Sequence, residues 1–156
     1  MKKIKIFLAS SIREFEKERI AIGDIVRQIQ NRIIDDGIRL DLFMCEFADN
    51  SMSNGRMQER YNDELRKSDI FIMLIGKKAG EFTIEEYEVS KEVNKIKRYI
   101  LFQDIESDNT VLELKNILEN DKQKGIEHTI TIFQKDEELP LIVKDIIEQN
   151  VIGVEW

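Results

Sequence analysis

Three carboxylates crowd one short segment of the chain. Residues 76–90 read GKKAGEFTIEEYEVS, with Glu85, Glu86 and Glu88 close together. A carboxylate can act as a nucleophile, as a general acid or base, or as a fixed negative charge that stabilises a developing cation. Each role needs a side chain that points into a site rather than into solvent. The orientation of the three glutamates therefore decides which of them could do chemistry.

Helical periodicity distinguishes Glu86 from its neighbours. The pattern predicts a helix over about residues 83–96, and at about 100° per residue Glu86 lies on the same side as Val89. Glu85 and Glu88 fall on the other side of this helix. We therefore expect Glu86 to point toward the protein interior and the other two glutamates to lie in solvent.

A helix cap explains the same residues without any chemistry. Thr83 followed three residues later by Glu86 fits a capping box, in which the threonine caps the helix and the glutamate bonds back to the threonine N–H. Ser11 and Glu14 repeat this pattern at the start of an earlier helix. A capping role and a catalytic role do not exclude each other, so both stay open for Glu86.

Alternating strand-like and helical segments must position these residues. Each strand-like segment alternates apolar with polar residues or is continuously apolar, and a segment of helical periodicity follows it. The predicted strands cover residues 3–9, 38–44, 69–75, 98–103 and 128–133. Five strands alternating with five helices predict an α/β three-layer sandwich, with a parallel sheet between two layers of helices, in a single domain over residues 1–156.

Strand composition predicts the order of this sheet. The second and fifth strands, IRLDLFM and HTITIF, are half polar, as is typical of edges, whereas the third and fourth are continuously apolar. These patterns fit the flavodoxin-like order 2-1-3-4-5. Its switch point lies between the first and third strands, and ligands bind there, at the carboxyl ends of the strands. The loops beside that crevice start at Ser10 and Gly76, so the glutamate-rich segment follows the expected ligand site.

Composition limits the partners and the classes of site. The net charge of −7 argues against a nucleic-acid partner, because phosphate backbones bind cationic surfaces. No apolar stretch approaches the roughly 20 residues of a membrane span, so no membrane partner is expected. Cys45 and His128 are the only residues of their types, which argues against disulfides, Cys–His catalysis and metal sites. With no secretory signal at the N-terminus, we expect a cytoplasmic location.

Two stretches of the chain carry a resemblance to a known family. IFLASSIREFEKER and GRMQERYNDELRKSDIFIMLIGKKAGEFTIEEYEVS, with the spacing between them, resemble a bacterial TIR-like (Toll/interleukin-1 receptor-like) domain over about residues 3–135. The pattern of Thr83, Glu86 and Ser90 is also similar to that of nucleoside 2-deoxyribosyltransferases. Both families have the sheet order 2-1-3-4-5 and use a glutamate at a helix start to break N-glycosidic bonds. This catalytic role carries over to Glu86.

The resemblance implies an activity and a set of supporting residues. Active TIR enzymes cleave NAD at the nicotinamide–ribose bond, so NAD or a related nucleotide is the implied substrate, and no cofactor is implied. Ser10 and Ser11 would bind ribose or phosphate, and Arg13 would bind pyrophosphate through its fork of donors. Glu46 would bind a ribose hydroxyl, and Lys77 would attract the anionic dinucleotide. Each of these residues also fits a plain cap or a solvated side chain.

The resemblance also implies how the domain works. TIR-like domains of this kind often stand at the N-terminus of longer defence or signalling proteins and self-associate, and the segment 45–56 suits such contacts. Thr83 completes the implied substrate-binding residues. Many TIR enzymes stack an aromatic ring on the substrate, for which Phe82 and Tyr87 are the candidates here.

Three functions therefore stay open. The first is an NAD-cleaving effector, which requires Glu86 to be reachable inside a pocket. The second is a non-catalytic TIR-like adaptor, in which Glu86 would be locked to Thr83 with no cavity beside it. The third is a nucleoside deoxyribosyltransferase-like enzyme or a nucleotide-sensing module, which would need a tight nucleoside-sized pocket completed by a partner subunit.

Overall fold

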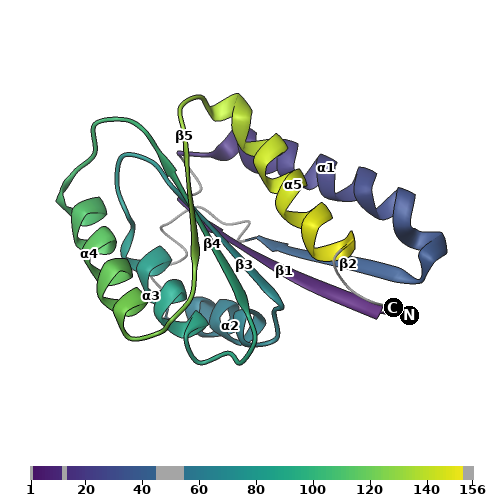
Figure 1. The fold of residues 1–156 in the computed structure, drawn as a ribbon, viewed down its shortest axis with the longest axis horizontal. Coiled ribbons are helices and arrows are strands. Elements are labelled where there is room, and N and C mark those ends of the chain that lie inside the picture. The colour runs from purple at the N-terminus through teal and green to yellow at the C-terminus, as the bar shows by residue number, and fades with distance from the viewer. Residues whose placement is uncertain (1, 12–13, 45–54, 153–156) are drawn as a thin grey trace.

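The computed structural model describes residues 2–11, 14–44 and 55–152 (Figure 1). Its strands form one sheet in the order β2-β1-β3-β4-β5, and every neighbouring pair is parallel. The strands are β1 (Lys2–Ser10), β2 (Ile38–Met44), β3 (Ile70–Ile75), β4 (Lys97–Gln103) and β5 (Thr129–Phe133). The predicted α/β three-layer fold and the flavodoxin-like strand order are both confirmed.

Helices cover both faces of this sheet (Figure 1). One layer holds α1 and α5, which lie side by side, and the other holds α2, α3 and α4. Their bounds are α1 (Glu16–Ile33), α2 (Gly55–Arg66), α3 (Glu81–Ser90), α4 (Asn109–Gln123) and α5 (Leu139–Ile152), with short 3-10 turns at Ile34–Asp36 and Asp136–Glu138. In the part of the chain that the structure describes, no helix is long and apolar enough to cross a lipid bilayer.

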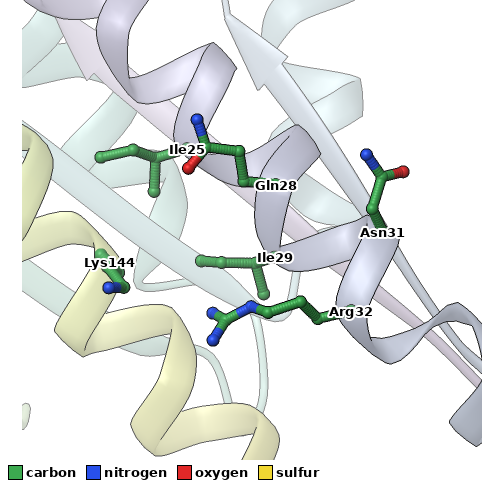
Figure 2. A pocket seen from close by; sticks show the side chains of 6 residues that line it. All are labelled: Ile25, Gln28, Ile29, Asn31, Arg32 and Lys144. Atoms are coloured by element: carbon green, nitrogen blue, oxygen red, sulfur yellow. The ribbon is translucent and has the colours of Figure 1, made fainter.

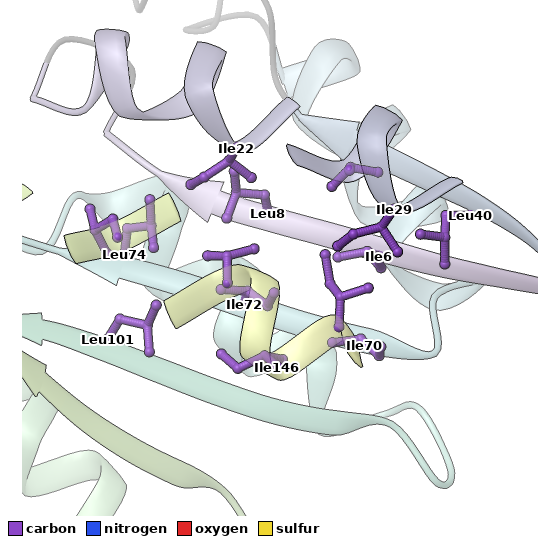
Figure 3. Packing of buried hydrophobic residues seen from close by; sticks show 14 of the residues in the cluster. Ile6, Leu8, Ile22, Ile29, Leu40, Ile70, Ile72, Leu74, Leu101 and Ile146 are labelled. Carbon is purple, nitrogen blue, oxygen red and sulfur yellow. The ribbon is translucent and has the colours of Figure 1, made fainter. Parts of the chain in front are cut away.

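Alternation along the strands divides the core into two halves. On β1, Ile6 and Leu8 face the layer of α1 and α5, where Leu8 lies near Ile22 and Ile6 near Ile29 of α1 (Figure 3), whereas Phe7 faces the other layer. Fully burying a side chain of this size contributes about 1.5–3 kcal/mol to folding. The two half-cores fix both helix layers on the sheet and so fix the positions of the loops at its edges.

Burial follows the predicted distinction between central and edge strands. All residues of β3 are buried, from Ile70 to Ile75. On β5 only Phe133 is buried, while Ile130 and Ile132 are 47% and 66% exposed. The continuously apolar strand is therefore central, and the alternating strand lies at an edge, as the sequence predicts.

Helix α3 begins earlier and ends sooner than predicted. It starts at Glu81 after Gly80, an N-cap with extended backbone and no side-chain cap bond, so Thr83 lies inside the first turn. The capping box predicted for Thr83 and Glu86 is therefore wrong. After Ser90 the N–H groups bond three residues back, and the Ser90 carbonyl accepts one of these bonds at 3.2 Å. Such tight turns do not continue an α-helix, which explains why it stops well before residue 96.

Candidate functional site

Glu86 points into the protein from the middle of α3. It is 7% exposed, whereas Glu85 and Glu88 are both exposed. Glu88 pairs on the surface with Lys91, with 2.9 Å between the carboxylate oxygen and Nζ. The orientation predicted for the three glutamates is confirmed, and Glu86 is the one that could do chemistry inside the protein.

Two buried amides on α2 connect to the glutamates of α3. Gln58 Nε2 donates to Asn62 Oδ1 at 2.9 Å, and Asn62 Nδ2 donates to Glu85 Oε2 at 2.9 Å. The Gln58 side chain also lies close enough to Glu86 to lower the pKa of its carboxyl. The Gln58 Oε1 atom is buried and has no hydrogen-bond partner among the described residues. Because buried polar atoms are nearly always paired, this oxygen beside Glu86 is suited to accept a bond from a ligand or a water.

A buried arginine reaches the same region from the other helix layer. Arg19 of α1 is 6% exposed, and its Nη1 donates to Ser10 Oγ at the end of β1, at 3.1 Å. The positive charge of Arg19 is close enough to Glu86 to lower the pKa of that carboxyl. Ser10, Arg19 and Glu86 thus gather where β1 and β3 end, at the switch point of the sheet.

The environment of Glu86 favours its protonated form. Burial raises the pKa of this carboxyl to about 8, and the negative charge of Glu85 acts in the same direction. The Gln58 side chain and the charge of Arg19 lower the pKa but do not offset the burial. Glu86 is therefore mostly neutral at pH 7 in the free protein. A carboxyl with so perturbed a pKa, near the carboxyl ends of β1 and β3, is a candidate functional group.

The loops after β1 and β3 meet at Glu14. Ser11 Oγ accepts the Glu14 N–H at 3.4 Å, but the Glu14 carboxylate accepts the N–H of Lys77 instead of returning to Ser11. The capping box predicted for Ser11 and Glu14 is therefore wrong. A Cβ atom on Gly76 would lie 2.6 Å from Glu14 Cδ, so a side chain at this position would push the Glu14 carboxylate away from the Lys77 N–H. The Glu14 carboxylate joins the two loops that flank the crevice.

The other predicted site residues differ in how they are placed. Thr83 is buried in the first turn of α3, and the side chain of Lys77 is exposed just after β3. Both belong to the connection that leads to Glu86. Arg13 and Glu46 lie outside the described residues, as do residues 45–54 of the predicted assembly segment.

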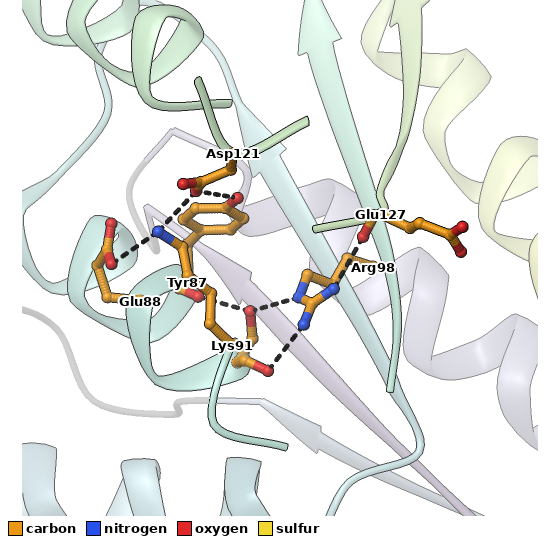
Figure 4. A network of polar contacts seen from close by, with 7 residues as sticks. Tyr87, Glu88, Lys91, Arg98, Asp121 and Glu127 are labelled. Carbon is orange, nitrogen blue, oxygen red and sulfur yellow. Dashed lines mark hydrogen bonds and ion pairs between the residues drawn. The ribbon is translucent and has the colours of Figure 1, made fainter. Parts of the chain in front are cut away.

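Tyr87 cannot stack on a substrate. It is fully buried, and its hydroxyl donates to Asp121 Oδ2 of α4 at 2.7 Å (Figure 4). Asp121 also pairs with Lys91, with 2.6 Å between Oδ2 and Nζ. Phe82 is partly buried and packs against the core of the α2, α3 and α4 layer. Tyr87 is therefore wrong as an aromatic candidate, and Phe82 stays a prediction.

Arg19 and Gln58 are functional candidates that the sequence reasoning missed. Arg19 follows the buried Phe15 by four residues and precedes the buried Ile22 by three, which is the spacing of one helix face. Gln58 precedes the buried Leu65 by seven residues, again on one face. The spacing could have placed both side chains in the interior. They were overlooked because arginine and glutamine usually face solvent.

A cavity of about 400 Å³ lies between α1 and α5 (Figure 2). The apolar Ile25 and Ile29 line it together with the cationic Arg32 and Lys144. Arg32 Nη2 bonds across the groove to Glu148 Oε1 of α5 at 2.7 Å. These apolar and ionic contacts are typical of a helix–helix interface, so we do not include this cavity in the candidate site.

Comparisons with known proteins give no match. No family model, no curated protein and no solved structure matches the chain. Among the residues that the structure describes, no group of three or more His, Cys, Asp or Glu side chains is placed to hold a metal ion. The functional interpretation therefore depends on the environment of Glu86 and on the residue pattern around it.

Proposed function

We propose that this chain cleaves NAD at the N-glycosidic bond between nicotinamide and ribose, as a TIR-like effector domain in bacterial defence or signalling. One observation carries the proposal: a single buried carboxyl, Glu86, lies at the carboxyl ends of β1 and β3 with Arg19 and an unpaired amide oxygen of Gln58 beside it. Ligands of doubly wound folds bind at these carboxyl ends of the strands. NAD is the substrate in this proposal and not a cofactor.

The reaction requires few protein groups. When the glycosidic bond breaks, both electrons stay with the nicotinamide nitrogen, which loses its positive charge, so the leaving group needs no proton. The ribose carbon becomes cation-like, as in glycoside hydrolysis, and an ionised Glu86 stabilises it by charge. Water adds to that carbon and releases a proton, giving ADP-ribose. A lone carboxylate in a polar crevice is sufficient for this chemistry.

Glu86 must lose its proton before the bond breaks. Burial holds its pKa at about 8 in the free protein. The nicotinamide ring of NAD carries a positive charge, and an opposite charge close to a carboxyl favours the ionised form. Arg19 already acts in that direction. Glu86 would therefore ionise when NAD binds and stay mostly neutral at pH 7 without it.

Groups around the same carboxyl ends of the strands would bind the rest of the dinucleotide. Serine and threonine hydroxyl groups suit ribose and phosphate oxygens. The carboxylate of Glu46 suits a ribose hydroxyl, and the cations Arg13 and Lys77 suit pyrophosphate. The proposed substrate-binding residues are Ser10, Ser11, Arg13, Glu46, Lys77 and Thr83.

A non-catalytic assembly module is the second candidate. The observation that favours it is the deep burial of Glu86 beside Gln58, because a neutral buried carboxyl next to an amide can be purely structural. A nucleoside deoxyribosyltransferase-like enzyme would use the same carboxylate on a different substrate. Its leaving base is uncharged and would need a proton, whereas that of NAD does not.

Incubation with NAD separates these candidates. The purified chain at high concentration should release nicotinamide together with an equal amount of ADP-ribose in its open or cyclised form. Deoxynucleosides should stay intact in the same assay. Release of free base from deoxynucleosides but not from NAD would favour the deoxyribosyltransferase-like activity. No turnover of either substrate would favour the assembly module.

A further inference from the structure

A second cavity lies at the amino ends of the strands, where β4 and β5 begin. Its volume is about 580 Å³, and it is formed by the starts of these two strands and the chain between α4 and β5. The Glu86 site lies at the carboxyl ends of the parallel strands, whereas this cavity lies at their amino ends. The lining residues that matter below are Ile96, Lys97, Arg98, Lys122, Ile126 and His128.

Basic side chains dominate this cavity although the whole chain is acidic. Lys97, Arg98, Lys122 and His128 all line it, and Glu127 is its single acidic lining residue. None of the four basic side chains forms an ion pair within the described part of the chain. In a protein of net charge −7, three cations, Lys97, Arg98 and Lys122, without an ion-pair partner among the described residues are conspicuous. Their charges are available to an anion from solution.

Arg98 is held in a fixed position by neutral groups. Its Nε donates to Ser90 Oγ at 3.0 Å, its Nη1 to the Glu127 carbonyl at 2.8 Å, and its Nη2 to the Ser90 carbonyl at 3.3 Å (Figure 4). Burial lowers the pKa of this guanidinium. The nearby carboxylate of Asp121 is already bound by Tyr87 and Lys91. The guanidinium is thus oriented without a counter-charge in contact, and it keeps N–H donors to spare.

His128 adds a polar atom that lacks a partner. Its Nδ1 is buried and makes no hydrogen bond to the described residues. Burial lowers the pKa of the ring and outweighs the Ile126 backbone and the Asp121 charge, which raise it, while the charges of Arg98 and Lys122 lower it further. A bound anion would accept a hydrogen bond from Nδ1. Its charge would also oppose the effect of Arg98 and Lys122 and raise the pKa of the His128 ring.

We propose that this cavity binds a small phosphate-bearing molecule of nucleotide size. The phosphate would accept hydrogen bonds from Arg98 and His128 and would pair with Lys97 and Lys122, because fixed arginine donors match phosphate oxygens. The apolar part of the ligand would lie in the rest of the cavity, which Ile96 and Ile126 help to line. The proposal is independent of any activity at Glu86.

The single histidine makes the proposal testable by NMR, since the ring signals can only come from His128. Pyrophosphate, inorganic phosphate and AMP are each titrated into the protein at constant ionic strength. Pyrophosphate and AMP should shift the ring signals saturably and raise the His128 pKa, and AMP should bind more tightly than inorganic phosphate. Chloride is the control for general screening.

Variants locate the site. Lys122→Gln should weaken binding of AMP about tenfold, the loss expected for one charge-assisted contact. Arg98→Gln should weaken it further, and the Lys122 variant remains decisive if Arg98→Gln fails to fold. Lys124→Gln is the matched control, because this exposed lysine is close in sequence but does not line the cavity. Glu86→Gln should bind AMP like the parent if the bound site is this one.

Three results would overturn the proposal. The first is a set of ring signals that do not move, or that move equally with chloride. The second is equal weakening by the Lys122 and Lys124 variants, which would indicate general surface attraction. The third is an affinity for AMP no better than that for inorganic phosphate, which would mean that the cavity does not select a ligand of nucleotide size.

Discussion

Glu86 carries a carboxyl that gives up its proton only above neutral pH in the free protein. Because kcat/KM reports the ionisation of the free enzyme, it should rise with pH and level off above about 8, with a slope near tenfold per pH unit below that value. The value of kcat should level off at lower pH, since the bound nicotinamide cation lowers the pKa. Initial rates of nicotinamide release across this range provide the measurement.

Arg19→Gln is the companion variant for this pH profile. Loss of the arginine removes a charge that lowers the Glu86 pKa, so the rise of kcat/KM should move to higher pH. Arg27→Gln is a suitable control, because Arg27 lies on the exposed side of the same helix. A parent profile that is flat or falls with pH would contradict the role of an ionised Glu86.

The same carboxyl makes protein stability depend on pH. Its pKa is about 8 in the folded chain against an ordinary value of 4.5, so the stability that Glu86 contributes is present below pH 4.5 and is lost as the pH rises through about 8. Glu86→Gln does not titrate there and should gain stability relative to the parent across this window. One pKa unit is worth about 1.4 kcal/mol, so the gain is at most on the order of 5 kcal/mol.

Denaturant unfolding near the two ends of that window measures this difference. Glu88→Gln serves as the control, because Glu88 is exposed and should show no comparable gain. A stability difference between parent and Glu86→Gln that stays constant with pH would mean that Glu86 is not buried in the native state.

Among the structural elements, the loops after β1 and β3 depend on one close contact. A side chain at position 76 would push the flexible Glu14 carboxylate away from the Lys77 N–H, so Gly76→Ala should destabilise the protein by about 1–3 kcal/mol through the lost hydrogen bond. Glu14→Ala removes the same hydrogen bond, so the double variant should be no less stable than the less stable single variant. Unfolding free energies of the parent, both single variants and the double variant give the coupling. Losses of the two single variants that simply add in the double variant would disprove the contact.

The sequence predicts the elements and their order well, because burial leaves a direct pattern in the strands. IRLDLFM and HTITIF alternate and lie at the edges, whereas IFIMLI is continuously apolar and central. The inward direction of Glu86 also follows from its spacing to Val89. Both results come from periodicity, which depends on neighbours along the chain.

The remaining parts of the site depend on contacts between distant segments. The start of α3 was missed because Gly80 caps it through the backbone, while Thr83 carries a misleading cap signal. The contact of Glu14 with Lys77 joins residues 63 apart in the chain, and no local pattern encodes it. The hydrogen bond from Arg19 to Ser10 likewise depends on the placement of α1 beside the end of β1, although the spacing of Arg19 on its helix is already that of a buried residue.

At the scale of the whole molecule, β5 is an edge strand with exposed apolar side chains. Ile130 and Ile132 of β5 are 47% and 66% exposed, and unpaired strand edges readily associate. We expect the specific activity to rise with protein concentration and this rise to weaken in Ile132→Lys. Leu141→Lys on α5 is the control, since Leu141 is 62% exposed away from the sheet edge. Full turnover by a verified dilute monomer would contradict this prediction.

Comparison of single glutamate variants tests the central claim most directly. Nicotinamide release from NAD is measured for the parent, Glu86→Gln, Glu85→Gln and Glu88→Gln, with a melting curve for each. Glu86→Gln should fold and lose at least about 100-fold in turnover, which matches the roughly 3 kcal/mol typical of a lost electrostatic stabiliser. Glu88→Gln should cleave NAD at nearly the parent rate, and Glu85→Gln should cleave it at the parent rate or faster below pH 8, because loss of the Glu85 charge lowers the pKa of Glu86. A folded Glu86→Gln that cleaves NAD as fast as the parent would contradict the catalytic role of Glu86.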